Sequence, residues 1–192
     1  TQTIHHQIIT PDTCTGIALL QSTSSGQITF LEKPEDTLLV NYIALQDIHT
    51  IGEAVYIAEH SVDLFNNEGW DTITGPGTRT LYWVDDEGDW EDPAHWSLES
   101  NGTGGECIPS PADTVIFDNN SFSQENQKVT INFNNAFARS LLWEDVQFMP
   151  EFTGISGGTF LRIYGSLLFD PAMYFTFPGY ILFGSRNKNE FI

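Results

Sequence analysis

Apolar residues occur along this chain in short runs that glycine, proline and polar turns interrupt. No stretch repeats its apolar residues every three to four positions, as a helix with one buried face would. Short runs rich in β-branched and aromatic residues, bounded by turn residues, are typical of strands. The pattern therefore predicts an all-β protein, with strands at 16–20, 27–31, 38–48, 53–64, 82–84, 113–117, 131–133, 140–143, 151–153, 160–163, 174–177 and 180–183.

Similar runs recur at a regular spacing in the second half of the chain. Leu141, Leu161 and Ile181 lie 20 residues apart, each in a short apolar run, and Leu19 and Leu39 have the same spacing. A short period with two or three strands per repeat is the signature of a β-solenoid, whose coils bury inward side chains against their neighbours. We therefore expect right-handed, parallel β-helix-like coils of about 20 residues. Leu141, Leu161 and Ile181 are expected to form one inward stack. An antiparallel β-sandwich is the alternative that the spacing leaves open.

The best boundary between domains is the polar stretch Asp71–Thr80, which contains Gly75, Pro76 and Gly77. Linkers between domains are commonly short, polar and rich in glycine and proline. We therefore expect one unit at 1–75, closed by Trp70 as a terminal plug, a linker at 76–79 and a second unit at 80–192.

The segment Tyr82–Phe117 contains three of the five tryptophans, Trp83, Trp90 and Trp96. Asp85–Gly88 is expected to form a turn in which Gly88 can take a positive φ. Asp92-Pro93 is a helix-start signal, because Asp is a favourable N-cap and proline suits the first helical position. One helical turn there is expected to bring Trp96 beside Trp90.

These side chains are expected to cap the second unit. A solenoid needs a cap because its open end exposes an apolar row and unpaired strand edges, and aromatic rings cover a large area each. The predicted structural cap consists of Trp83, Trp90, Trp96 and Pro93, lying over the first coil near Val115, Phe117 and Ile131.

The same segment resembles the opening of a known repeat module. Its residues follow the order Tyr82-Trp83, Gly88-Asp89-Trp90, Asp92-Pro93, His95-Trp96-Ser97, a glycine-rich loop at 101–105, and Pro109-Ser110-Pro111 leading into Asp113–Phe117. This order resembles modules of very large adhesin-like surface proteins of gliding and other Bacteroidetes, which are exported by the type IX secretion route. The N-terminal segments 17–23, 40–58 and 61–70 resemble the close of the same module.

The resemblance implies a fold and a cellular location, and it implies little about chemical activity. It implies that residues 1–75 are the last coils of one module and that residues 80–192 are the cap and first coils of the next, in a secreted cell-surface protein. The implied role is a non-catalytic structural or adhesive repeat of a stalk, related to gliding motility. Its implied partners are neighbouring repeats of the same chain and extracellular polysaccharide or other surface proteins. The alternatives are a carbohydrate-binding module and an enzyme of the β-helix polysaccharide lyase kind.

Strong acidity narrows the partners further. Lys and Arg number 7 against 26 Asp and Glu, a formal net charge of −19. Nucleic acid and anionic membrane surfaces attract clustered Lys and Arg, so we expect neither as a partner. No run reaches the ~18 apolar residues of a membrane span, and no signal peptide is expected at Thr1. The two cysteines, Cys14 and Cys107, allow one disulfide or two buried free thiols.

An acidic turn is the one candidate metal site in the sequence. Six acids fall between Asp85 and Asp92, around Gly88. Ca²⁺ takes six to eight oxygen ligands, and acids around a glycine turn can supply several of them. The candidate calcium ligands are Asp85, Asp86, Glu87, Asp89 and Asp92. The alternative is a solvated turn without an ion, because the full EF-hand pattern is absent.

Signals for other chemistry are few. His5 and His6 lack a second cluster that would complete a metal site, so we expect them to be solvated. No Ser/His/Asp order, phosphate loop or zinc spacing is present, so we expect no catalytic residue and no cofactor. Bases are scarce in the repeat region, where Arg139 and Arg162 precede Arg186. Three tyrosines, Tyr164, Tyr174 and Tyr180, can either stack on sugar rings or pack between coils.

Overall fold

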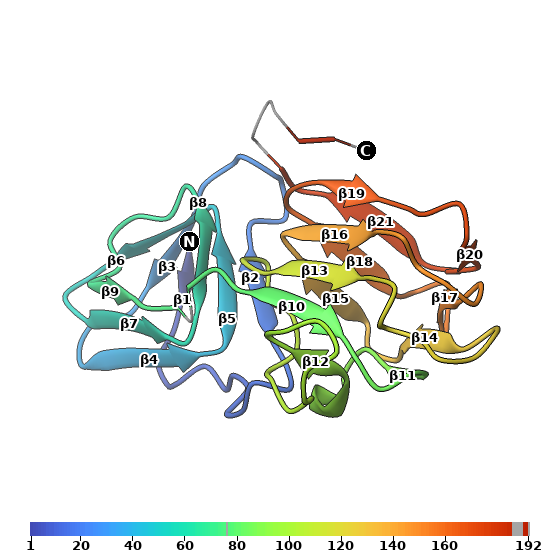
Figure 1. The fold of residues 1–192 in the computed structure, drawn as a ribbon. Coiled ribbons are helices and arrows are strands. Elements are labelled where there is room, and N and C mark those ends of the chain that lie inside the picture. Colours follow the sequence, from blue (N-terminus) through green and yellow to red (C-terminus); the bar gives the residue numbers. More distant parts are fainter. Residues whose placement is uncertain (76, 186–189, 192) are drawn as a thin grey trace. The chain divides into compact units, whose positions relative to one another are not determined.

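The computed structural model describes residues 1–75, 77–185 and 190–191, and the chain forms two compact units (Figure 1). The N-terminal unit is Thr1–Gly77 and the C-terminal unit is Thr78–Ile192. The division falls inside the predicted linker 76–79, although Pro76 and, near the end of the chain, Arg186 lie outside the described residues. The chain is all-β, with 40% of it in strands and 2% in helices, as the pattern predicted.

In the N-terminal unit, residues 1–75 and 77 contain nine short strands. They are β1 (Gln2–Thr3), β2 (Ala18–Gln21), β3 (Thr29–Glu32), β4 (Thr37–Asn41), β5 (Ile43–Gln46), β6 (Ile48–Ile51), β7 (Val55–Glu59), β8 (Val62–Phe65) and β9 (Thr72–Ile73). The strands form three sheets with the orders β1-β3-β6, β2-β5-β8 and β4-β7-β9, and neighbouring strands within each sheet are parallel. Successive strands therefore belong to different sheets.

Sharp corners separate these strands. The predicted strand 38–48 is wrong as one element: Tyr42, at φ 48°, and Asp47, at φ 60°, divide it among β4, β5 and β6. His60, at φ 51°, divides the predicted strand 53–64 into β7 and β8 in the same way. A residue in the left-handed region interrupts the extended path of a strand and bends it, so the chain turns into another sheet. Buried Asp47 holds its corner by accepting hydrogen bonds from the Gly26 amide at 2.8 Å and the Asn66 side chain at 2.7 Å.

A small apolar core fills the N-terminal unit. Leu38, Val40 and Leu45 are fully buried in it, and their strands contribute alternate residues, as half-buried strands do. Trp70, the predicted plug, packs against this core with its ring edge on Tyr56, at 5.9 Å between centroids.

The described residues of the C-terminal unit form twelve strands and one short helix. They are β10 (Thr80–Trp83), β11 (Gly88–Asp89), the 3₁₀ helix η1 (Pro93–His95), β12 (Trp96–Ser97), β13 (Thr114–Phe117), β14 (Lys128–Ile131), β15 (Asn135–Ala138), β16 (Ser140–Trp143), β17 (Glu151–Gly154), β18 (Phe160–Ile163), β19 (Leu167–Leu168), β20 (Tyr174–Phe175) and β21 (Tyr180–Phe183).

The strands of the C-terminal unit also distribute over three sheets. The sheet orders are β12-β10-β13-β16-β19, β11-β14-β17-β20 and β15-β18-β21. From β13 to β21 the chain visits these sheets in the same order three times, and each strand pairs in parallel with the strand three further on. Among the described residues only β10 and β12 pair antiparallel, which does not fit the sandwich alternative.

The predicted stack at a 20-residue spacing is only partly right. Leu161 pairs with Ile181, but Leu141 lies in another sheet, between Val115 and Leu167, at a spacing of 26 residues. Leu19 and Leu39 likewise pair into different sheets. The loops between strands differ in length, so the number of residues between two neighbouring strands of one sheet varies. Residues that are equally spaced in the sequence therefore need not lie beside one another in a sheet.

Register places like side chains beside one another on the sheet β12-β10-β13-β16-β19. The inward residues of its strands, such as Leu81, Val115 and Leu141, are fully buried in one core. Phe117 and Trp143, which are register partners two residues further along β13 and β16, belong to the same core. The outward residues begin with Thr80, Thr114 and Ser140, which occupy the same register position on three neighbouring strands. The sheet therefore joins a closed aromatic core to a hydroxyl-bearing outer face.

Candidate functional site

The aromatic segment contributes three tryptophan rings to the core of the C-terminal unit. Trp83, Trp90 and Trp96 are each at most 1% exposed. The rings of Trp90 and Trp96 meet edge to face at 4.8 Å, and Trp96 meets Trp83 at 5.1 Å. All three rings lie within 6.4 Å of the Phe117 ring, and Trp96 donates its indole N–H to the Trp90 carbonyl at 2.8 Å. No ligand can reach these rings while the corner is folded.

The turn that positions Trp96 follows the local sequence signals. Asp92 caps η1 and accepts a hydrogen bond from the Ala94 amide at 2.9 Å, and Pro93 occupies the first helical position. The prediction for Gly88 is wrong in its reason, because Asp85 and Asp86 take the left-handed conformation, at φ 62° and 69°. Gly88 is instead required for space, since a Cβ there would lie 1.9 Å from the His95 ring, which stacks on Trp83.

The acids of the turn point to different partners instead of converging. Asp86 accepts hydrogen bonds from the Ser123 amide and hydroxyl at 2.7 and 2.8 Å. Glu91 accepts from the amides of Asn132 and Phe133, both at 2.9 Å. These two carboxylates therefore fasten the cap to the loops that follow β13 and β14. The other candidate calcium ligands, Asp85, Glu87, Asp89 and Asp92, are exposed.

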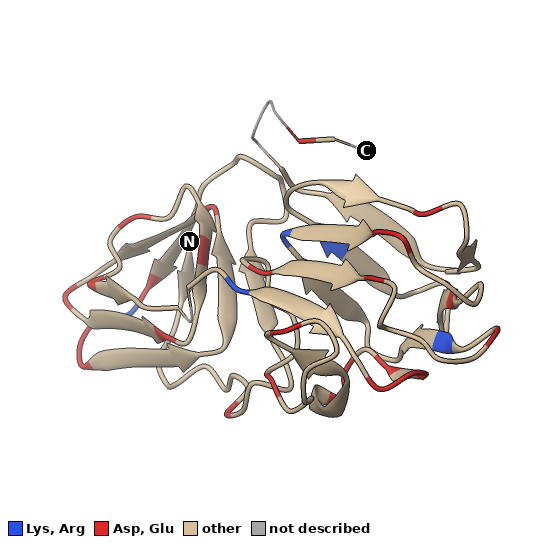
Figure 2. Ribbon diagram, viewed as in Figure 1, with Lys and Arg blue, Asp and Glu red and all other residues tan. Residues whose placement is uncertain are grey.

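In the described part of the chain no group of three or more His, Cys, Asp or Glu side chains is arranged to hold a metal ion. Figure 2 shows the acids spread over turns and loops, with few bases between them. The calcium site stays a prediction. Because an ion that binds only the folded state stabilises it, thermal melts in millimolar Ca²⁺ and in chelator are expected to differ. Identical melting temperatures would mean that the turn is only solvated.

Glu91 gives the cap a pH dependence. Burial raises its pKa above the ordinary value for glutamate, partly opposed by the two backbone amides that donate to it. A carboxyl with a raised pKa in the folded state binds its proton preferentially there, so its contribution to stability increases as pH falls from the raised pKa to the ordinary one. We expect the stability of the native protein relative to Glu91→Gln to rise over that window, measured by denaturant unfolding at several pH values. A constant difference would contradict this.

The candidate sugar-stacking tyrosines do not form one row. Tyr174 and Tyr180 are 49% and 59% exposed but belong to different sheets, and Tyr180 already stacks on Phe160 at 5.5 Å. Tyr164 is half-buried, and its burial raises the pKa of the phenol. His5 and His6 are exposed.

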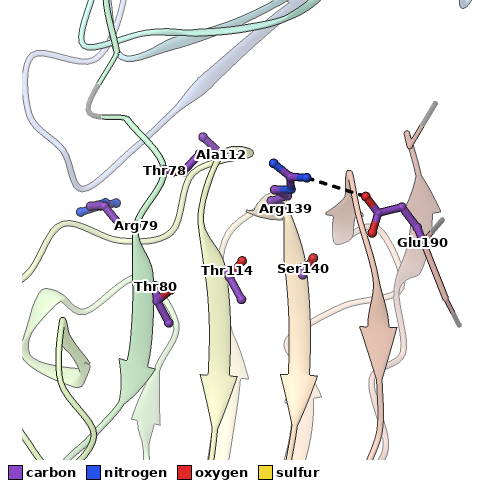
Figure 3. Close-up of a pocket in the computed structure, with 8 residues that line it drawn as sticks. All are labelled: Thr78, Arg79, Thr80, Ala112, Thr114, Arg139, Ser140 and Glu190. Atoms are coloured by element: carbon purple, nitrogen blue, oxygen red, sulfur yellow. Dashed lines mark ion pairs between the residues drawn. The ribbon is translucent and has the colours of Figure 1, made fainter. Parts of the chain in front are cut away.

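A polar pocket of about 340 Å³ lies on the outer face of β10, β13 and β16 (Figure 3). The residues that line it are Thr78, Arg79, Thr80, Ala112, Thr114, Arg139, Ser140 and Glu190. Three hydroxyls, one from each strand, form its floor side by side, and two of the seven basic residues stand at its rim. Such a pocket offers several hydrogen-bond donors and acceptors and little apolar surface.

Arg79 and Asp113 fix one side of this pocket. The fully buried Asp113 carboxylate accepts from Arg79 Nε at 3.0 Å and from Arg79 Nη2 at 2.6 Å, a two-pronged pair. It also accepts from the Arg79 and Ser110 amides at 3.1 and 2.8 Å. The remaining guanidinium N–H groups face the carbonyls of Cys107 and Ile108 at 3.4 and 3.3 Å. The guanidinium of Arg79 is therefore occupied by structural hydrogen bonds within the C-terminal unit.

Arg139 is differently placed. Its side chain is 46% exposed, and its Nη2 lies 3.8 Å from Glu190 Oε1, beyond hydrogen-bond distance. Glu190 accepts a hydrogen bond from Ser166 Oγ at 2.7 Å. The hydroxyls of Thr80 and Thr114 make no hydrogen bond to any residue that the structure describes. The sequence offered no signal for this pocket beyond the scarcity of bases, because the spacing of the hydroxyls follows from the register.

Two further observations concern the cysteines and the helices. Cys14 and Cys107 are both disulfide-bonded, so the free-thiol alternative is wrong. No helix among the described residues has the length and apolar character needed to cross a membrane.

No protein-family model matches this chain, and no curated protein or solved structure is significantly similar to it.

Proposed function

We propose that both units are β-solenoids and that the chain is a non-catalytic structural or adhesive repeat of a large secreted surface protein. The observation that carries this proposal is the order of strands in the C-terminal unit, which returns to each of three sheets every third strand with parallel pairing. Such stacking makes each coil depend only on its neighbours, which suits an elongated spacer built from repeats.

An extracellular address is supported by three features. Disulfides persist in oxidising compartments, and both cysteines are disulfide-bonded. A net charge of −19 keeps a surface protein soluble and suits neither nucleic acid nor an anionic membrane as a partner. The third support is the resemblance of Tyr82–Phe117 to the type IX-secreted adhesin modules of gliding Bacteroidetes. On this proposal the partners are neighbouring repeats of the same chain.

A non-catalytic role is supported by the way the conspicuous side chains are used. The three cap tryptophans are closed off from solvent, and the acids Asp86 and Glu91 accept hydrogen bonds that hold loops. Catalytic acids would instead need a shared cleft that faces a substrate.

The solenoid proposal can be tested by pairing cysteines across neighbouring coils. Ile116 and Leu142 are register partners on the outer face, so the double variant Ile116→Cys/Leu142→Cys is expected to form a disulfide readily. The control, Ile116→Cys/Ser140→Cys, places the second cysteine two residues out of register, about 8 Å away by strand geometry, and is expected to stay reduced. Thiol counting by mass spectrometry distinguishes the two. Equal oxidation of both variants would contradict the proposed stacking.

The functional part of the proposal needs cells that produce the protein. Antibodies against this chain are expected to label intact cells, and brief external proteolysis is expected to remove the label. Incubation of the purified chain with polysaccharides is expected to release neither reducing ends nor unsaturated products. Product release would favour the lyase alternative, and labelling only after permeabilisation would contradict the surface address.

Carbohydrate binding is the second candidate function. The observation that favours it is the hydroxyl-lined pocket beside Arg139, which is compatible with a solenoid scaffold because it occupies an outer face.

A further inference from the structure

We propose that the pocket on the outer face of β10, β13 and β16 binds a saccharide that carries one carboxylate. Arg139 takes the carboxylate, and the hydroxyls of Thr80, Thr114 and Ser140 bind the hydroxyl groups of the sugar. The inference gives the carbohydrate-binding candidate a site and a ligand class. It does not require that the chain be part of a longer stalk.

The two arginines of the pocket differ in whether their guanidinium N–H groups are already hydrogen-bonded. Arg79 is 15% exposed and already binds Asp113 through two N–H groups. Arg139 is 46% exposed, and the Glu190 carboxylate that it faces is too far away for a hydrogen bond. A guanidinium presents a rigid fork of donors that matches a carboxylate in a two-pronged arrangement. Arg139 is therefore the anion-binding group of this pocket.

Glu190 shows that this position accepts a carboxylate. Its Oε1 lies 3.8 Å from Arg139 Nη2 (Figure 3). Its Oε2 accepts a hydrogen bond from Ser166 Oγ at 2.7 Å. Because the contact with Arg139 is long, a ligand carboxylate that approaches the fork in its plane would form the stronger interaction. Glu190 thus acts as an internal competitor for the same arginine.

The hydroxyl row makes the site suited to a sugar. Thr80, Thr114 and Ser140 occupy one register position, so their hydroxyls recur about every 4.8 Å across the strands. A hydroxyl group can both donate and accept a hydrogen bond, and sugar hydroxyls have the same capacity. Ser140 Oγ accepts from the Ser166 amide at 3.1 Å, which leaves its own O–H to donate.

The charge of the chain limits the ligand to few negative charges. At a net charge of −19 a polyanion is repelled at long range, whereas one carboxylate bound at Arg139 is attracted locally. An acidic peptide would satisfy Arg139 but leave the hydroxyl row without matched partners. A short oligosaccharide with one uronic acid fits both features.

The test is a titration of the whole chain, followed by NMR or calorimetry, with an aldobiouronic acid, which is one hexuronic acid linked to one neutral sugar. The comparison ligands are the same disaccharide with its carboxylate reduced to an alcohol, and an N-acetylated alanine–glutamate dipeptide amide, which carries one carboxylate and no sugar hydroxyls. We expect the uronic acid to bind at least tenfold more tightly than either. The proposal is wrong if the reduced sugar or the dipeptide binds as well, or if the uronic acid does not bind at ten millimolar or so.

Variants locate the site and separate it from other basic residues. Arg139→Ala is expected to weaken binding at least tenfold, and the isosteric Thr114→Val severalfold. Arg162→Ala removes an arginine from another sheet and is expected to leave affinity within twofold. Glu190→Gln removes the internal competitor and is expected to tighten binding severalfold. Equal affinity of the Arg139 and Arg162 variants, each shown to be folded by circular dichroism, would overturn the assignment, as would weaker binding by Glu190→Gln.

Discussion

Trp96→Ala is expected to lower the free energy of unfolding of the C-terminal unit by about 3–5 kcal/mol, the usual cost of truncating a buried tryptophan. Trp96 is fully buried, and its ring packs edge to face on Trp83, Trp90 and Phe117. The variant also loses the hydrogen bond to the Trp90 carbonyl. Because four of the five tryptophans belong to this unit, denaturant unfolding followed by tryptophan fluorescence reports mainly on it.

The matched comparison is Tyr174→Ala, which removes a large aromatic ring from the same unit. Tyr174 is 49% exposed, so its loss is expected to change the free energy of unfolding by no more than about 0.5 kcal/mol. The Trp96 variant is also expected to associate, because an opened cap exposes apolar rings. A Trp96→Ala protein of native stability that had lost glycan binding would mean that this corner is a ligand site and not a cap.

The buried aromatic corner and its turn could be predicted from sequence because their signals are local. Asp92 and Pro93 define a helical start that does not depend on distant residues, and the number of aromatic residues nearby requires a buried corner. The reason for Gly88 could not be predicted, because it depends on where His95 folds back. Local rules therefore gave the turn, and the close approach of His95 became visible only in three dimensions.

The strands were predicted better than their connection. The class and most strand positions follow from short apolar runs, but the corner at Tyr42 has no glycine or proline to mark it. β15 was missed because Asn135–Ala138 contains two alanines and an asparagine, residues that are depleted in strands. The 20-residue period misled because loops of unequal length carry Leu141 and Leu161 into different sheets.

The pocket could not be predicted from the sequence, because loops of unequal length also separate the residues that line it. Thr80 and Thr114 are 34 residues apart, whereas Thr114 and Ser140 are 26 apart, so no single period connects the three hydroxyls. Only the hydrogen-bonded register brings them side by side. The inward apolar residues would have located the three hydroxyls if the number of residues between neighbouring strands of this sheet had been known.

Removing either member of the buried pair Arg79–Asp113 is expected to destabilise the C-terminal unit by about 3–5 kcal/mol, the cost of leaving one buried charge without its partner. Asp113 is fully buried, and Asp113→Ala leaves the Arg79 guanidinium and the amides of Arg79 and Ser110 without their acceptor. Arg79→Met leaves the buried carboxylate with only backbone donors. Denaturant unfolding monitored by tryptophan fluorescence measures both variants.

Burial, and not the short contact itself, is what makes this pair important. The pair Lys128–Glu151 has nearly the same N–O separation, 2.7 Å against 2.6 Å, but the Lys128 side chain is 55% exposed. Exposed pairs are screened by water and lose side-chain entropy, so Lys128→Met is expected to shift the unfolding midpoint far less. In the double variant Arg79→Met/Asp113→Ala no buried charge remains unpaired, so its destabilisation should fall short of the sum of the two single changes by about 1–3 kcal/mol. Additive single changes, or an equal effect of Lys128→Met, would mean that the two residues of the buried pair act independently.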